Sequence, residues 1–162
     1  TLERRCGPTG ADAGDAPVLP LADGRGATYV AWTGRTRSGR RAVKFARVGS
    51  GASNSALVLS HERGAILDDV AAGPGRALAI TYAAPRPIRR NPYVVATFAA
   101  LRRGGGSFGL ADRLTPRGVA GTRGSRVAFQ PLTGEPVVAV PFLLGLNVAV
   151  GAAVGPPAPA MP

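Results

Sequence analysis

The sequence predicts an all-β fold made of antiparallel, four-stranded modules that repeat along the chain. Glycine and proline are abundant, at 23 and 15 of the 162 residues, and they punctuate the chain at short intervals. Short runs of apolar and β-branched residues lie between these turns, and no run follows the spacing of an amphipathic helix. The same order of turn, strand and hairpin also recurs about every 50 to 59 residues.

Each module is expected to begin with a short apolar strand, at residues 18–21, 67–71 and 126–129. A turn and a longer strand follow, and the first two of these longer strands end in an aromatic residue, Trp32 and Tyr82, at positions 50 apart. Because the two aromatic residues share one position in the repeat, we expect them to pack between modules rather than to stack on sugars.

A further strand is predicted at residues 42–48, 93–99 and 147–150, and it forms a hairpin with the strand before it. Beyond it, residues 49–60 and 104–115 align without a gap at an offset of 55, and they end in Leu59-Ser60 and Leu114-Thr115. Each module therefore has up to four short strands. The modules span residues 15–60, 61–115 and 116–155, between a disordered segment at 1–14 and a Pro/Ala tail at 156–162.

One uncharged stretch has two interpretations. Residues 137–154 contain 18 positions without a charge, which is near the lower limit for a membrane-spanning helix. Pro141, Gly145, Asn147 and Gly151 interrupt the stretch, and its flanks lack aromatic or basic anchors. We favour a buried strand pair and keep the membrane helix as the alternative.

Four-stranded meanders of this length are typical of β-propeller blades. The turn, the strand that ends in Trp32 or Tyr82, and the glycine-rich stretch that closes in Leu-Ser or Leu-Thr resemble the extracellular repeat propellers of high-GC bacteria, in the sialidase-like and exo-β-propeller grouping. The resemblance covers residues 15–155. It implies a partial β-propeller-like array of about three blades, a secreted or cell-surface location, and a scaffold that binds glycans or proteins. Because closed propellers have about four to eight blades, we expect further blades or self-association.

The resemblance weakens where catalysis would be encoded. Sialidase-like blades commonly carry the turn Ser-x-Asp-x-Gly-x-Thr-Trp. Here residues 22–29 keep Gly26, Thr28 and an aromatic at Tyr29, but they have Ala22 and Gly24 in place of the serine and the aspartate. We therefore expect a non-enzymatic binding or interaction module. A sialidase-like glycoside hydrolase fragment and a polyanion-binding protein are the alternatives.

Few residues could support catalysis. Glycoside hydrolysis needs two carboxyl groups at a set separation, or a tyrosine nucleophile beside a carboxylate. Asp68 and Asp69 are adjacent, but neighbours on a strand point to opposite faces unless a bulge intervenes, so a turn or strand-edge role is expected. His61 is the only histidine and is assigned to a solvated link. No catalytic residue, cofactor site or metal site is predicted, and the run from Gly104 to Gly106 is interpreted as a hairpin loop.

The net charge of +11 favours anionic partners, including nucleic acid and acidic glycans. Lys44 is the only lysine, and the excess of arginine accompanies abundant Ala, Gly, Pro and Val, which all have GC-rich codons. Arginines nevertheless gather in the same hairpin loop of two modules, and equivalent loops of successive blades emerge on one face. The candidate anion-binding residues are Arg35, Arg37, Arg40 and Arg41 in the first module and Arg86, Arg89 and Arg90 in the second. The corresponding loop of the third module, 141–145, has no charge.

Residues 1–14 show no basic segment followed by an apolar one, so no signal peptide is expected within them. Thr1 stands where an initiator methionine would, and we expect processing or truncation of a longer reading frame. Cys6 is the only cysteine, which excludes an internal disulfide and leaves the redox compartment open.

Overall fold

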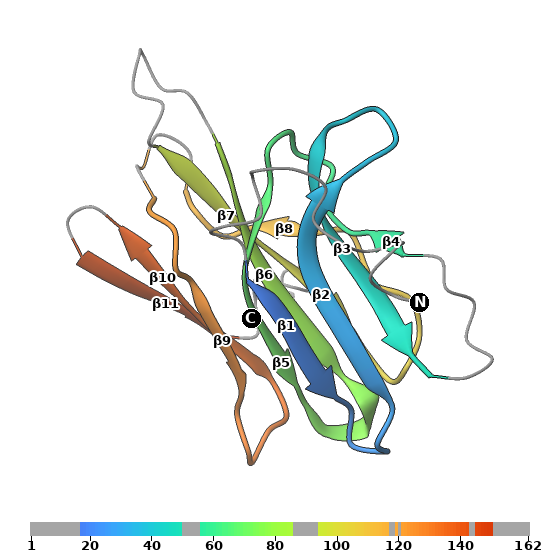
Figure 1. The fold of residues 1–162 in the computed structure, drawn as a ribbon. Coiled ribbons are helices and arrows are strands. Elements are labelled where there is room, and N and C mark those ends of the chain that lie inside the picture. The colour runs from blue at the N-terminus through green and yellow to red at the C-terminus, as the bar shows by residue number, and fades with distance from the viewer. Residues whose placement is uncertain are drawn as a thin grey trace.

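Three antiparallel sheets pack face to face as layers in the described part of the chain (Figure 1). The computed structural model describes residues 17–49, 56–85, 94–116, 119 and 121–142, together with the backbone of 145–150. The predicted all-β fold class is confirmed. Over the described residues the sheets form an open array and do not close into a ring or a barrel.

Each sheet is a meander of strands that are consecutive in sequence. Module 1 contains β1 (Val18–Ala22), β2 (Thr28–Arg35), β3 (Arg41–Val48) and β4 (Leu57–Val58). Module 2 contains β5 (Ile66–Ala72), β6 (Leu78–Pro85), β7 (Val95–Arg102) and β8 (Asp112–Arg113), with one turn of 3-10 helix at Pro74–Arg76. Module 3 contains β9 (Arg126–Phe129), β10 (Pro136–Phe142) and β11 (Gly145–Val150).

The strand register shows that modules 1 and 2 are true repeats. Trp32 pairs with Lys44 across β2 and β3, and Tyr82 pairs with Phe98 across β6 and β7. Lys44 then pairs with Val58 on β4, just as Phe98 pairs with Arg113 on β8. The equivalence of Trp32 and Tyr82 that their sequence spacing predicts is therefore confirmed.

A buried hydroxyl group fixes the fourth strand in both modules. Ser60 Oγ accepts a hydrogen bond from the amide of Val43 at 2.9 Å, and Thr115 Oγ1 accepts one from the amide of Thr97 at 2.8 Å. The amides of the preceding leucines, Leu59 and Leu114, donate to the carbonyls of the same two partners, Val43 and Thr97, both at 2.9 Å. The Leu-Ser and Leu-Thr endings are thus one structural feature that fastens the outer edge of the third strand.

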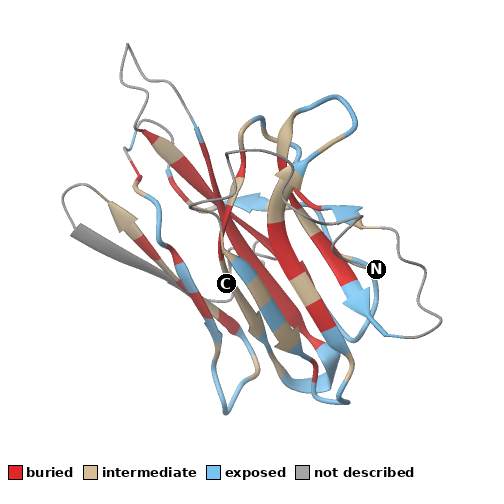
Figure 2. Cartoon of the chain, in the orientation of Figure 1, coloured by how far each residue is buried: buried red, intermediate tan, exposed pale blue. Residues whose placement is uncertain are grey.

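Module 2 is the middle layer and buries both of its faces (Figure 2). On one face, Ile80 and Tyr82 pack with Tyr29 and Phe45 of module 1. On the other face, the main contacts are made by Ala79, Ala99 and Leu101 with Val127, Val138 and Val140 of module 3. Because alternate residues of β6 point to opposite faces, one strand contributes to both cores.

The two repeat aromatics have different surroundings. Tyr82 is fully buried between modules 1 and 2 and stacks on Phe98, with 5.3 Å between ring centroids, as expected. Trp32 is also buried, but it alternates with Tyr29 and Ala31 and so faces away from module 2. It packs above Gly34 beside the aliphatic part of Lys44. Packing between modules is therefore confirmed for Tyr82. Trp32 is buried, as expected of a core residue, on the face of module 1 that is turned away from module 2.

The uncharged stretch forms a strand pair, as favoured from the sequence. β10 and β11 are antiparallel partners from Val137 with Val150 to Phe142 with Gly145, so residues 141, 142 and 145 of the expected 141–145 loop belong to strands. Val138 and Val140 are buried against module 2. In the part of the chain that the structure describes, no helix is long and apolar enough to cross a membrane.

The glycine-rich run forms the turn that leaves β7. Gly104 and Gly105 have φ angles of 58° and 83°, in the left-handed region that glycine adopts without strain. The amide of Gly106 donates to the carbonyl of Arg103 at 3.1 Å. The interpretation of this run as a hairpin loop is confirmed.

Candidate functional site

A cleft of about 350 Å³ lies where the first strands of the three modules approach one another. β5 runs beside both β1 and β9 in the centre of the array (Figure 1). The cleft is lined by Pro17, Leu19, Leu67, Asp68, Arg123, Gly124 and Arg126. It therefore combines apolar walls with one carboxylate and two guanidinium groups, a mixture that is typical of ligand sites.

A bulge in β5 aims two adjacent carboxylates at module 3. The register between β5 and β6 shifts between Leu67 and Asp69. Asp68 Oδ2 accepts hydrogen bonds from Ser125 Oγ at 2.8 Å and from the Ser125 amide at 3.3 Å, and Asp69 Oδ2 accepts one from the Val127 amide at 2.9 Å. The expectation that these neighbours point to opposite faces is wrong, because the extra residue of the bulge turns both toward β9. They hold the start of β9, so the expected strand-edge role remains.

Two arginines line the mouth of the cleft and are only loosely paired. Arg123 Nε lies 3.7 Å from Asp68 Oδ1, and one terminal nitrogen of Arg126 lies 3.9 Å from Asp69 Oδ1. Their side chains are 41% and 74% exposed. Within the described residues neither guanidinium group donates a hydrogen bond, so both can still grip an anionic group in two-pronged fashion.

Asp68 is the acid that lines the cleft, and its pKa is raised. Burial raises the pKa of its carboxyl group above the usual 3.8, and the hydrogen bonds from Ser125 and the charge of Arg123 offset only part of that increase. A shifted acid in a cleft often marks a functional site, but ion-pair networks also produce such shifts. Both hydrogen bonds to Asp68 Oδ2 come from Ser125, so its first role here is to join modules 2 and 3.

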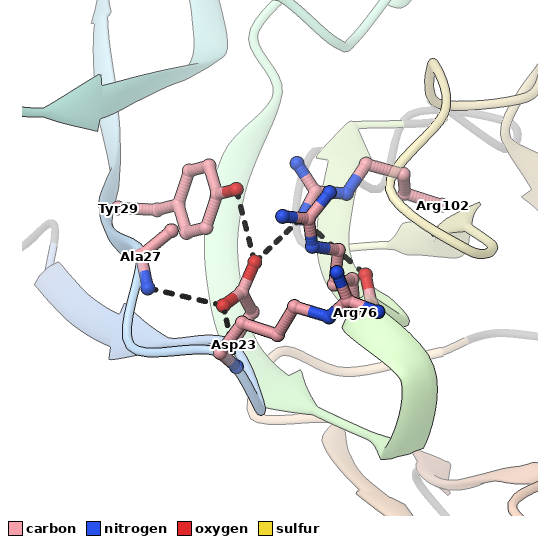
Figure 3. Close-up of polar contacts among 6 residues, drawn as sticks. Asp23, Ala27, Tyr29, Arg76 and Arg102 are labelled. Carbon is pink, nitrogen blue, oxygen red and sulfur yellow. Dashed lines mark hydrogen bonds and ion pairs between the residues drawn. The ribbon is translucent and has the colours of Figure 1, made fainter.

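A second charged cluster lies between modules 1 and 2 (Figure 3). Asp23 Oδ1 accepts hydrogen bonds from the amides of Arg25 and Ala27, both at 3.0 Å. Asp23 Oδ2 accepts one from the Tyr29 hydroxyl at 3.2 Å and lies 3.8 Å from a guanidinium nitrogen of Arg102. Sequence reasoning missed this cluster, although Asp23 lies in the segment compared with the sialidase-like turn.

The contacts of Asp23 and Arg102 hold modules 1 and 2 together, so this cluster has a structural role and is not a ligand site. Burial alone would raise the pKa of Asp23, but the two amides, the Tyr29 hydroxyl and the charge of Arg76 outweigh it and bring the pKa below 3.8. The guanidinium group of Arg102 lies 4.6 Å from the Tyr29 ring centroid and is almost fully buried. It also donates to the carbonyl of Arg76 at 3.4 Å.

A tyrosine and a carboxylate are paired inside the molecule, as a sialidase-like mechanism would require. The Tyr82 hydroxyl donates to Glu62 Oε2 at 2.8 Å. Tyr82 is inaccessible, however, and burial together with Glu62 raises the pKa of its hydroxyl far above the usual value. A nucleophile needs the opposite shift and contact with its substrate. This pair therefore serves packing.

The arginine-rich hairpin of module 1 is present as predicted. Arg35 and Arg41 are register partners at its base, and the Arg35 guanidinium group donates to the Gly39 carbonyl at 2.9 Å. Arg37 is exposed, and Arg40 is half-buried. In module 2, Arg86, Arg89 and Arg90 lie outside the described residues. The ends of β6 and β7 that carry this second loop lie at the same end of the molecule as the first hairpin (Figure 1).

His61 is exposed in the link between β4 and β5, and Cys6 lies outside the described residues. In the ranges that the structure describes, no cluster of three or more His, Cys, Asp or Glu residues could hold a metal ion. No family model, curated protein or solved structure matches this chain.

Proposed function

We propose that this chain is a non-enzymatic, propeller-like binding module of extracellular type, and that its ligand site is the cleft between the first strands of the three modules. The observation that carries the proposal is the position of Arg123 and Arg126, which line one cleft beside Leu19 and Leu67. Guanidinium groups bind carboxylate and sulfate, and apolar walls accept the face of a sugar ring. We infer an acidic glycan as the ligand.

The carboxyl groups of Asp68, Asp69 and Glu62 already accept hydrogen bonds within the chain, which supports a binding role over hydrolysis. Asp68 and Asp69 accept hydrogen bonds from Ser125 and Val127, which fix the two modules to each other. Tyr82 is buried against Glu62. Each pair that could resemble glycosidase machinery therefore has a structural use, and neither presents a free nucleophile to the cleft.

The proposal is tested by calorimetric titration of the purified chain with a uronic-acid oligosaccharide and with a neutral oligosaccharide of equal length. We expect saturable binding of the acidic sugar alone. Arg123→Gln and Arg126→Gln should each weaken it by about tenfold or more, because a hydrogen bond to a charged group is lost. Arg103→Gln removes the same charge from the exposed turn after β7 and should leave affinity unchanged. Equal losses in all three variants, or no binding, would refute the cleft as the site.

A second candidate function is polyanion binding through the β2–β3 hairpin. Four arginines fall within residues 35–41, and the chain carries a net charge of +11. Heparin affinity should then fall steeply with salt, and each arginine replaced by glutamine should reduce the slope of log K against log salt by about 0.7–0.9 if it contacts the polymer. Arg37→Gln is the first variant to test, because that side chain is exposed. An unchanged slope in a variant that lacks all four arginines would exclude the hairpin.

A further inference from the structure

Among the described residues, module 3 has one strand fewer than its neighbours. The strand orders are β1-β2-β3-β4 and β5-β6-β7-β8 in the first two modules, and β11-β10-β9 in the third. Among the strands that the structure describes, none pairs with the outer edge of β11, which lies at the far side of the array (Figure 1). An open edge presents a row of backbone N–H and C=O groups that can pair with another strand.

Modules 1 and 2 show what covers such an edge. Their fourth strands pair through two residues only, Leu57 and Val58 on β3, and Asp112 and Arg113 on β7. The next two residues then complete the contact, the leucine through its amide and the serine or threonine through its buried hydroxyl group. The segment that fits is therefore extended, short, and closed by Leu-Ser or Leu-Thr.

Residues 151–162, which follow β11, do not carry this pattern. β4 begins nine residues after β3 ends, at 57 against 48, and β8 begins ten residues after β7 ends, at 112 against 102. The same spacing after β11 reaches residues 159 and 160. Residues 151–162 contain neither Leu-Ser nor Leu-Thr, and prolines occupy positions 156, 157, 159 and 162. Proline has no N–H to donate, so it weakens strand pairing.

We propose that the outer edge of β11 is a strand-accepting site, which binds an extended segment of a partner protein that ends in Leu-Ser or Leu-Thr. Strand addition of this kind takes its affinity from main-chain hydrogen bonds and its specificity from a few side chains. In this chain, Leu59-Ser60 and Leu114-Thr115 already fasten their own sheets. A third pair, Leu132-Thr133, is bent into a turn in which the Thr133 hydroxyl donates to Gln130 Oε1 at 2.8 Å.

The charge of the chain favours a different protein over a second copy. Two copies with a net charge of +11 each repel one another at low salt, whereas a neutral or acidic segment is attracted. A second copy that supplied its own Leu-Ser or Leu-Thr segment would also have to release β4 or β8 from its sheet. That exchange opens one edge for each edge that it covers, so it gains little free energy.

The test uses the full chain and a fluorescent peptide with the sequence of residues 53–62, SNSALVLSHE, which contains the module 1 pattern. We expect a saturable rise in fluorescence anisotropy, and a photo-crosslinker in the peptide should label residues 145–150. A peptide N-methylated at its second leucine cannot donate the hydrogen bond that Leu59 makes, and it should bind about tenfold more weakly. A scrambled peptide should not bind.

Two proline variants of the chain localise the edge. Successive N–H groups of a strand point to opposite sides, so Asn147→Pro and Val148→Pro each affect a different edge of β11. The variant that keeps the wild-type melting temperature should lose peptide binding, and the other should melt earlier.

Crosslinks on β3 or β7, peptide binding unaffected by N-methylation, or no binding in the millimolar range would overturn the proposal. Concentration-dependent dimers crosslinked through β11 would assign the edge to a second copy instead. The sugar-binding variants Arg123→Gln and Arg126→Gln should not affect peptide binding, so the two proposals fail separately.

Discussion

Gly73 illustrates how a single position can be used differently in equivalent turns. Its amide donates to the carbonyl of Ala77 at 2.8 Å, as the amide of Asp23 donates to that of Ala27 at 2.9 Å. In module 1 this position supplies the carboxylate that faces Arg102. In module 2 it has no side chain, and the ring of Phe129 from module 3 occupies the space instead: a Cβ atom on Gly73 would lie 2.5 Å from that ring.

We expect Gly73→Ala to lower the free energy of unfolding by about 1–3 kcal/mol, because overpacking forces Phe129 or the turn to shift. Gly24→Ala is the matched control in the β1–β2 turn, since its added Cβ meets nothing within 4 Å. That change should remain within about 0.5 kcal/mol. Urea unfolding of the two variants measures both values, and equal losses would contradict the packing explanation.

The raised pKa of Asp68 predicts that part of the stability of the fold depends on pH, and replacing this residue by asparagine should remove that part. Because burial raises the pKa of this carboxyl group in the folded chain, folding favours its protonated form. That contribution is complete below the unfolded value of 3.8 and is lost as the pH rises through the higher folded value. An asparagine side chain at this position would remain neutral at every pH and keep an oxygen for Ser125.

The Asp68→Asn variant should therefore gain stability relative to the wild type as the pH rises from about 4 toward 7. The lowered pKa of Asp23 acts in the opposite direction, but it is shared by both proteins and cancels in the difference. Urea unfolding at several pH values gives this difference, and exposed Asp112→Asn controls for the loss of one negative charge. If the free energies of unfolding of the wild type and of Asp68→Asn changed in parallel with pH, the raised pKa of Asp68 would be contradicted.

At the scale of strands, a buried hydroxyl group stabilises the fold where it has a hydrogen-bond partner and costs free energy where it has none. Thr115 Oγ1 accepts the hydrogen bond of the Thr97 amide, so it fastens the fourth strand of module 2. Thr81 Oγ1 is equally buried on β6, yet it has no hydrogen-bond partner among the described residues. The same residue type thus stabilises one strand and imposes a desolvation cost on another.

Replacement by the isosteric valine should reveal this contrast. Thr115→Val leaves the Thr97 amide buried and unpaired, and we expect a loss of about 1–3 kcal/mol. Thr81→Val removes an unsatisfied hydroxyl group without changing shape, so its free energy of unfolding should stay level or rise by about 1 kcal/mol. Thermal and urea unfolding of both variants test the contrast, and a larger loss for Thr81→Val would reverse the assignment.

For the whole molecule, the central position of module 2 makes the array cooperative. Its two faces form separate cores with module 1 and module 3, and β6 contributes to both. Loss of one core exposes apolar surface on the sheet that also supports the other. We expect the three modules to unfold in one transition, since small single domains commonly do so.

Val138→Ala tests this coupling from a distance. The substitution leaves a cavity in the core between modules 2 and 3 and should cost about 1–3 kcal/mol. Trp32, the only tryptophan, reports on module 1. Its fluorescence midpoint in urea should shift by the same amount as the far-UV circular dichroism signal. A fluorescence midpoint that stays at the wild-type value would mean that module 1 unfolds alone.

Local patterns predicted most of the strands. The first strands expected at 18–21, 67–71 and 126–129 are β1, β5 and β9, because apolar runs between glycine and proline turns specify strands over short distances. The cleft was not predictable in this way. It depends on Asp68 meeting Ser125, which lies 57 residues further along the chain, and on a bulge that no local pattern announces.

The sequence by itself determined the repeat and the hairpins, because turn residues and alternating side chains act on near neighbours. The Leu-Ser and Leu-Thr endings recur in the sequence, but their hydroxyl groups meet the amides of Val43 and Thr97, 17 and 18 residues away, only in the folded sheets.

The tertiary structure alone decided which faces dock. Trp32 and Tyr82 hold the same position and face the same side of their sheets, but only for Tyr82 does that side meet a described module. The tertiary structure also joined Asp23 to Arg102, because a carboxylate and a guanidinium group attract only once the packing of two sheets has brought them close and excluded water.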